Sequence, residues 1–185
     1  MARSTQLSRV AGVALALAAA ALLAGCLADA TLQPASSPHP GTVIRAVVTR
    51  HTDGDTARFL LDGGTEEKVR FIGIDTPEVS GETEPYGAEA SAYTAEAIPI
   101  GTTVWLELDA EERDRYGRLL AYVWLERPDE TSNGQIRSGM LNARLLLDGY
   151  AQVYTFPPNV KYVDQFTRYQ TEARGAGRGL WSDSR

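Results

Sequence analysis

The sequence predicts an α+β fold that is mostly β, in which a five-stranded closed barrel carries three helices. Five segments rich in β-branched and aromatic residues are separated by turn-forming residues. A stretch of strong helix formers follows the third of these segments, and two more helical patterns follow the fifth. Strands that mostly follow one another directly favour a small barrel over an alternating α/β sheet.

The first three strands are expected to form a meander. Segment 43–50, "VIRAVVTR", is rich in β-branched residues, and segment 56–62 follows the turn-like "HTDGD". Segment 66–75, "EEKVRFIGID", follows a Gly-Gly turn. Strands separated by such short turns are expected to pair antiparallel with their neighbours.

The remaining elements complete the barrel and its helices. A helix is expected over 86–98, where alanines recur at helical spacing before "PIG". The alternating segment 102–109 and the apolar segment 118–126 predict strands four and five. Helices are expected at about 140–147, ending before a glycine, and at about 160–174. This order of elements predicts a barrel of the oligonucleotide-binding-fold type.

Residues 1–26 have the pattern of a bacterial signal peptide: two arginines, an apolar run and a small-residue cleavage site. The ending "LLAGC" resembles a lipoprotein box, which implies cleavage before Cys26 and lipid on its thiol. An uncleaved membrane anchor is the alternative. Either reading places the domain outside the cytoplasm, attached to a membrane through the lipid on Cys26 in the first case.

Cys26 is the single cysteine, which excludes a disulfide framework and a cysteine-based zinc site. Residues 27–42 contain several prolines and serines and no apolar periodicity, as in a flexible tether. One folded domain is therefore expected over 43–182, with a short tail at 183–185. Nothing in the sequence implies a protein partner, and we expect a monomer.

The charge balance limits how the chain can bind nucleic acid. The 18 lysines and arginines and 24 acidic residues give a net charge of −6. A basic surface over the whole domain is therefore missing, which argues against tight non-specific binding through general counterion release. A local cluster of arginines in a cleft is still compatible with this balance.

Two short acidic motifs are candidates for a metal site. Asp75 and Thr76 lie where the third predicted strand ends, and Pro77 prevents that strand from continuing. Asp55, in "DGDT", lies where the second strand begins. Two carboxylates and a backbone carbonyl form a hard oxygen site suited to Ca²⁺. Each motif alone has a simpler reading, as turn chemistry or as a strand exit.

Four motifs in order resemble a known family. "DGDT", "VRFIGIDTPE", "YGAEASAYT" and "DRYGRLLAYV", followed by "GLWS" near the end, look like a staphylococcal-nuclease-type (thermonuclease) domain over residues 43–182. The resemblance implies an oligonucleotide-binding-type barrel with three helices. It also implies Ca²⁺ held by Asp55, Asp75 and the Thr76 carbonyl. Glu78 would occupy the position that activates or orients the attacking water.

The resemblance also implies how the substrate is bound. Arg70 and Arg118 would be the two phosphate-binding arginines. Tyr116 resembles a tyrosine near the nucleotide phosphate, and Arg115 stands where the family often has a lysine. Tyr154 matches an aromatic residue that stacks on a base, or is a core or rim aromatic.

Supporting positions and departures complete the comparison. Asp53 and Thr56 resemble residues near the metal, although Asp53 is equally well explained as turn chemistry. The loop 79–85 is shorter than the family's lysine-bearing loop and carries Glu82 and Glu84 instead. These glutamates would either repel phosphates or merely solvate the loop.

The predicted function is that of a Ca²⁺-dependent endonuclease outside the cytoplasm, which cleaves DNA and RNA to 3′-phosphate products. Phosphodiester hydrolysis needs positive charge where negative charge builds up, and arginines and a cation supply it. The alternative within the same fold is a weak or inactive nucleic-acid-binding lipoprotein. An unrelated solute-binding lipoprotein would leave the ordered motifs unexplained.

Overall fold

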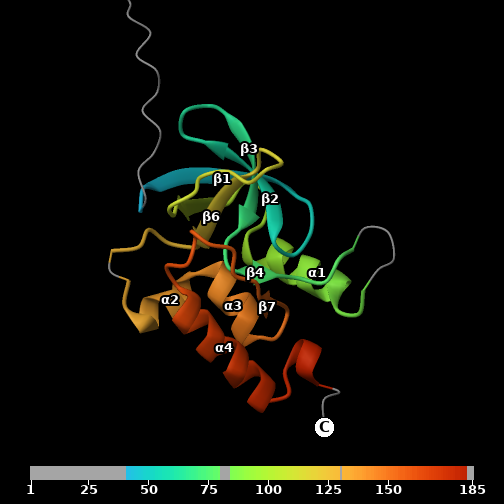
Figure 1. Cartoon of the computed structure of the whole chain (residues 1–185). Coiled ribbons are helices and arrows are strands. Elements are labelled where there is room, and N and C mark those ends of the chain that lie inside the picture. Colours follow the sequence, from blue (N-terminus) through green and yellow to red (C-terminus); the bar gives the residue numbers. More distant parts are fainter. Residues whose placement is uncertain (1–40, 80–83, 130, 183–185) are drawn as a thin grey trace, which may run out of the picture. The chain divides into compact units, whose positions relative to one another are not determined.

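The computed structural model describes residues 41–79, 84–129 and 131–182 (Figure 1). The predicted signal peptide, Cys26, almost all of the predicted tether, and the tail 183–185 lie outside the described residues. Among the helices of the described ranges, none has the length and apolar character needed to cross a membrane.

The predicted closed barrel of five strands is confirmed. Its strands are β1 (Val43–His51), β2 (Thr56–Leu61), β3 (Glu66–Phe71), β5 (Thr103–Glu107) and β6 (Leu119–Trp124). They are hydrogen-bonded in the order β1-β2-β3-β6-β5, and antiparallel pairing of β1 with β5 closes the barrel. The pairing of β3 with β6 is parallel, and the long connection 72–118 allows the crossover that parallel strands need.

Alternation along the strands fills the barrel interior. Ala57 and Phe59 of β2 and Val69 of β3 are fully buried. Arg58, between the first two, and Lys68, next to Val69, are only partly buried and point outward. Phe71 packs on Phe59 with ring centroids 6.4 Å apart. A period of two with one face buried fixes the register of these strands, because a one-residue slip would expose the core.

The third predicted strand, 66–75, is wrong as one continuous element. It ends at Phe71, and β4 (Ile74–Asp75) pairs instead with β7 (Gln152–Val153) in a separate two-stranded sheet. Gly73, with φ of +80°, makes the turn between β3 and β4. The break carries Asp75 away from the barrel wall and toward the helices.

Four α-helices are found in the described part of the chain, where three were expected: α1 (Gly87–Ala97), α2 (Asn133–Gly139), α3 (Leu141–Leu147) and α4 (Val163–Gly175). A 3₁₀ turn, η1 (Gly179–Trp181), follows them. The unexpected helix is α2. It contains two glycines and buries only Ile136, so it has no apolar periodicity to detect.

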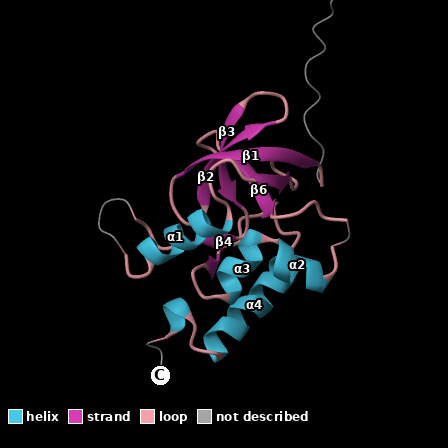
Figure 2. Cartoon of the chain, turned by 180° about the vertical axis from the view of Figure 1, so that it is seen from behind, coloured by secondary structure: helices cyan, strands magenta, loops and turns pink. Residues whose placement is uncertain are grey.

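The helices gather at one end of the barrel (Figures 1 and 2). Almost every side chain of α3 is buried, and this helix packs against α1, α2, α4 and β6. The helices and the barrel therefore share one apolar core. The functional side chains predicted from sequence lie on the turns and strand ends that emerge from it.

Candidate active site

The turn before β2 is held in place by polar groups of its own and of α1. The Asp53 carboxylate accepts a hydrogen bond from the Asp55 backbone at 3.1 Å, and Thr94 of α1 donates to the Gly54 carbonyl at 2.6 Å. A Cβ at Gly54 would lie 2.8 Å from the Thr76 hydroxyl oxygen. Only glycine therefore allows the "DGDT" turn to pack directly on Thr76.

This packing brings Asp55 to the other acidic motif. Asp55 is 5% exposed, and its Oδ2 accepts a hydrogen bond from the Thr76 backbone at 2.9 Å. Its Oδ1 accepts one from the Thr56 hydroxyl at 3.0 Å. The structure thus brings the predicted metal ligands Asp55 and Thr76 together, and Asp75 directly precedes Thr76.

Arg70 joins the two acidic motifs. Its Nε lies 3.1 Å from Asp55 Oδ1, and its Nη2 lies 2.7 Å from Asp75 Oδ1. Its Nη1 donates to the carbonyls of Phe71 and Ile74 at 2.9 and 2.8 Å. A guanidinium has five N–H donors, and within the described residues one N–H on Nη2 has no acceptor. Arg70 is therefore fixed in orientation with one donor left for a ligand.

Negative charge is concentrated around this arginine. Burial, together with repulsion from Asp55, raises the pKa of Asp53 to about 6. Burial also raises the pKa of Asp75, and repulsion from Asp55, Glu78 and Glu84 adds to this despite the opposing effect of Arg70. A carboxyl group whose pKa is raised by neighbouring negative charge lies where a bound cation would be favoured.

A hard cation at this place stays a prediction, because the described residues contain no group of three or more His, Cys, Asp or Glu side chains suited to holding a metal. The ligands that would hold it are two carboxylates, Asp55 and Asp75, and the carbonyl of Thr76. Oxygen donors of this kind suit Ca²⁺. Asp53 and Thr56 contact Asp55 and would support its position.

Glu78 is held through its backbone by Glu84. The Glu78 N–H donates to Glu84 Oε2 at 3.1 Å, and the Glu84 N–H donates to the Glu78 carbonyl at 3.0 Å. A Cβ at Gly87 would lie 2.6 Å from that same carbonyl. Glu84, for which sequence suggested repulsion or solvation, thus fixes the backbone that carries Glu78. Glu82 lies outside the described residues.

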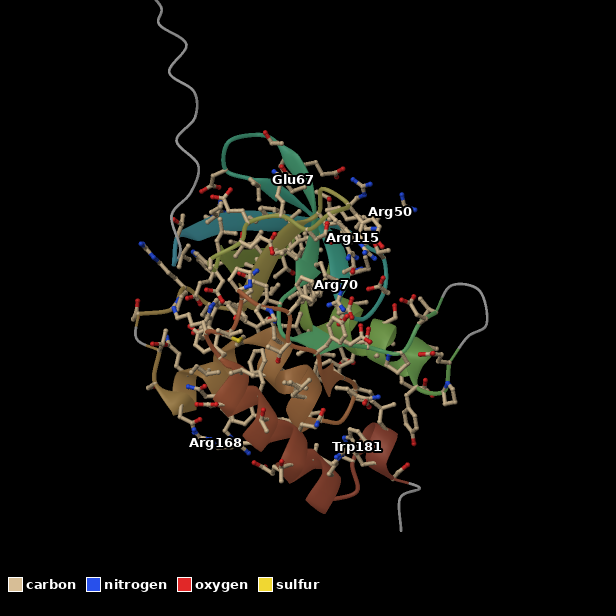
Figure 3. The ribbon with its side chains drawn as sticks, in the orientation of Figure 1. Arg50, Glu67, Arg70, Arg115, Arg168 and Trp181 are labelled. Carbon is tan, nitrogen blue, oxygen red and sulfur yellow. The ribbon has the colours of Figure 1, made fainter. Side chains whose placement is uncertain are left out.

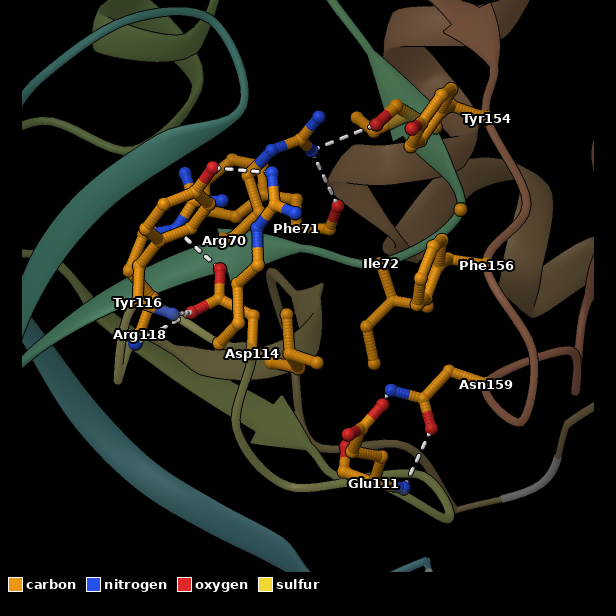
Figure 4. Close-up of a pocket in the computed structure, with 14 residues that line it drawn as sticks. Arg70, Phe71, Ile72, Glu111, Asp114, Tyr116, Arg118, Tyr154, Phe156 and Asn159 are labelled. Carbon is orange, nitrogen blue, oxygen red and sulfur yellow. Dashed lines mark hydrogen bonds and ion pairs between the residues drawn. The ribbon is translucent and has the colours of Figure 1, made fainter.

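A pocket of about 410 Å³ opens beside Arg70 (Figure 4). We call it the arginine pocket. Its lining includes four of the predicted substrate-binding residues besides Arg70: Arg115, Tyr116, Arg118 and Tyr154. The predicted metal ligands do not line it, and Arg70 is the side chain shared by the pocket and the acidic motifs.

One side of the arginine pocket is the turn 114–118. Asp114 accepts hydrogen bonds from the backbone N–H groups of Tyr116 and Arg118 at 2.9 and 3.0 Å, and Gly117 has φ of +78°. Arg118 Nε donates to Asp114 Oδ2 at 2.6 Å. No described residue accepts a hydrogen bond from Nη1 or Nη2 of Arg118, so both nitrogens are available to an anion.

The turn also carries the exposed Tyr116. The Arg115 guanidinium lies over its ring, 4.7 Å from the centroid, and Arg118 lies 5.5 Å from it. Tyr116 is 68% exposed. This arrangement gives two cations and an aromatic face at the pocket rim.

The opposite side of the pocket comes from the segment after β7 (Figure 4). Tyr154 and Phe156 are 54% and 68% exposed, and Asn159 holds Glu111 through two backbone hydrogen bonds. Sequence reasoning missed Phe156 and Asn159. The signal available was the repeat of an aromatic two residues after Tyr154, which puts both rings on one side of an extended chain.

Comparison with known proteins agrees with this arrangement. The family model described as "Staphylococcal nuclease homologue" matches residues 68–183. Thermonuclease from Staphylococcus hyicus is 37% identical over 74% of this chain and 75% of its own length. Endonuclease YncB from Bacillus subtilis is 34% identical over 83% of this chain and 71% of its own length. Thermonuclease from Staphylococcus intermedius is 39% identical over 73% of this chain and 74% of its own length. This chain therefore belongs to the staphylococcal nuclease homologue family.

Proposed function

We propose that this protein is a Ca²⁺-dependent endonuclease, which hydrolyses phosphodiester bonds of DNA and RNA and leaves 3′-phosphate products. The relatives that cover most of the chain are named thermonuclease and endonuclease. The observation that carries the proposal is the position of Arg70, whose guanidinium contacts both acidic motifs and lines the arginine pocket.

The two arginines would bind the scissile phosphate from the pocket side. Arg118 offers both terminal nitrogens, and a planar fork of this kind matches two phosphate oxygens. Arg70 offers its remaining Nη2 donor, in an orientation already fixed by four contacts. Donors held in place before the reaction stabilise the charge that develops in the transition state without reorganisation.

Glu78 would act on the water. It would accept a proton from the attacking water or hold that water in line, while the 5′ oxygen leaves and takes up a proton. The products are then a 3′-phosphate and a 5′-hydroxyl. Ca²⁺ held by Asp55, Asp75 and the Thr76 carbonyl would supply positive charge for the phosphate oxygens. Glu84 would keep the Glu78 backbone in place.

The predicted lipid anchor at Cys26 would hold this activity outside the cytoplasm. A Ca²⁺ site of roughly 10⁻⁴ to 10⁻³ M affinity would be filled there and nearly empty inside a cell. The domain bounds 43–182 and a monomeric state are part of the same proposal.

The test compares wild type with Glu78→Gln, Arg118→Ala and Arg168→Ala, using the full chain in mild detergent and denatured DNA with Ca²⁺ or excess EGTA. We expect cleavage only with Ca²⁺, with a loss of at least about 10²-fold in the first two variants. Arg168 lies on α4 at the helical end and serves as the matched loss of one arginine (Figure 3).

Circular dichroism of each variant verifies folding, so that lost activity is not lost structure. Wild type that binds the DNA and leaves it intact would contradict the catalytic proposal. That result would favour the alternative of an inactive nucleic-acid-binding lipoprotein. Cleavage that persists in EGTA would contradict the dependence on Ca²⁺.

A further inference from the structure

We propose that three outward-facing cations on the barrel, Arg50, Arg58 and Lys68, form a track for the phosphates of a single-stranded polynucleotide beyond the arginine pocket. We call these residues the cation row. The inference rests on the proposed function, because it extends the substrate path from that site.

Strand register places the three cations in one line. Arg50 of β1 is paired with Arg58 of β2, and Arg58 is paired with Lys68 of β3. Directly paired residues in antiparallel strands share a face, with Cβ atoms about 5 Å apart. The residues on either side of Arg58, Ala57 and Phe59, are fully buried, so the row faces outward.

A bulge in β1 brings Arg50 into the row. The pairing shifts between Val48 and Arg50, so that Thr49 is the extra residue. Buried Val48 pairs with buried Phe59 before the bulge, and exposed Arg50 pairs with Arg58 after it. Without the bulge, the place opposite Arg58 would belong to Thr49. Bulges commonly redirect a side chain in this way.

The row has more positive charge than its surroundings neutralise. Like charges directly opposite one another destabilise a sheet. Glu66 contacts Arg58 at 3.4 Å and is also held by Thr49, so it offsets one charge. Among the described residues, the side chains of Arg50 and Lys68 take part in no hydrogen bond or ion pair. In a chain of net charge −6, this excess favours an anionic partner.

The row begins beside the proposed active site. Lys68 and Arg70 are two residues apart on the same face of β3, which is about 7 Å along the strand. Figure 3 shows Arg50, Arg115 and Arg70 along one flank of the barrel. A row of cations that continues from a phosphate-binding arginine is suited to the backbone of a nucleic-acid strand, which carries a charge at each nucleotide.

The test measures binding in EGTA, where no cleavage is expected, by fluorescence anisotropy across about 50 to 200 mM salt. The full chain in mild detergent is compared with the double variant Arg50→Ala/Lys68→Ala. The control is Arg127→Ala/Arg168→Ala, which removes the same charge elsewhere. The probes are a single strand of about 16 nucleotides and a dinucleotide that fills only the pocket.

For the long strand, we expect the row variant to lose about 1.4 from the magnitude of the slope of log K against log salt, because each phosphate contact contributes about 0.7. The control variant and the dinucleotide should show no such loss. Row and control variants with equal slopes would overturn the row and leave the proposed function intact. Equal weakening of the dinucleotide would also overturn it, because the pocket itself would then be altered. Wild type that binds neither probe would contradict both proposals.

Discussion

Two buried carboxylates, Asp55 and Glu107, both cost desolvation free energy, but they differ in what their surroundings use them for. They are 5% and 2% exposed, and each accepts several hydrogen bonds. Glu107 accepts from Trp124 Nε1 at 2.7 Å and from the Tyr162 hydroxyl at 2.9 Å, and it forms an ion pair with Lys161. Trp124 belongs to β6, and Lys161 and Tyr162 directly precede α4.

The surroundings of the two groups explain the difference. The ring of Tyr162 meets the ring of Tyr122 edge to face, with centroids 4.7 Å apart. Burial raises the pKa of the Tyr162 hydroxyl above its usual range, and the nearby carboxylates Glu107 and Asp109 raise it further. The hydroxyl therefore stays protonated and remains a donor. Asp55 instead lies against Asp53, whose pKa it helps to raise. Glu107 therefore stabilises the fold, whereas the region of Asp55 retains repulsion that a ligand can relieve. A buried carboxylate that lies beside other carboxylates is therefore the better candidate for a functional group.

The largest expected effect comes from Glu107→Ala, which should lower the free energy of unfolding by about 3 to 5 kcal/mol. The reason is that buried donors and the Lys161 ammonium would lose their acceptor. Urea unfolding measures the change, with Glu126→Ala as an exposed control. Cleavage per folded molecule should be unchanged.

Glu107→Gln provides a milder variant if the alanine variant does not fold. It keeps an acceptor oxygen and should lose less stability. A reduced cleavage rate in folded Glu107→Gln, with unchanged substrate binding, would contradict the inference that Glu107 serves only the stability of the fold.

The barrel was predictable because its strands are runs of β-branched and apolar residues bounded by turn residues, and β1 and β3 bury alternate residues over part of their length. The same rule failed at Gly73. The run "VRFIGID" continues the apolar pattern, but a positive φ at Gly73 turns the chain toward β7, a partner some 80 residues away. Long-range pairing of this kind leaves no local periodicity.

The site was predicted through residue types, whereas its connections required the structure. Arg70 was expected to bind phosphate, but sequence did not indicate that it also holds Asp55 and Asp75. The contact of Glu84 with Glu78 was missed for a similar reason, since a glutamate in an acidic loop looks solvated. Contacts between turns depend on the folded barrel, so no local pattern encodes them.

Gly54→Ala tests whether the position of Asp55 depends on close packing with Thr76. A Cβ at residue 54 would meet the Thr76 side chain at 2.8 to 2.9 Å, so the two motifs would be pushed apart. We expect a loss of about 1 to 3 kcal/mol in unfolding free energy, together with weaker Ca²⁺-dependent cleavage. Thermal melting and cleavage assays measure the two effects.

Gly63→Ala is the matched control, because a Cβ there meets nothing within 4 Å and Gly63 does not have a positive φ. It should leave stability unchanged or raise it by up to about 1 kcal/mol. If Gly54→Ala behaves like Gly63→Ala in both assays, the acidic motifs do not need this contact.

The smallest expected effect concerns the turn that presents Arg118. Burial alone would raise the pKa of Asp114, but hydrogen bonds from the Arg118 side chain and from the Arg118 and Tyr116 backbone outweigh it and hold the pKa below the usual value of 3.8. A depressed folded-state pKa stabilises the fold above the unfolded value, and this contribution is lost as pH falls through the folded value.

Asp114→Asn should therefore lower the free energy of unfolding by about 1 kcal/mol at pH 7, and the difference from wild type should shrink below pH 3.8. Urea unfolding of both proteins at neutral and acidic pH measures this difference directly, with Asp129→Asn as an exposed control. A gap that stays constant down to the acidic end would mean that Asp114 acts through its shape rather than its charge. In that case the turn would present Arg118 without help from the charge of the Asp114 carboxylate, and the ion pair between these two side chains would contribute little to stability.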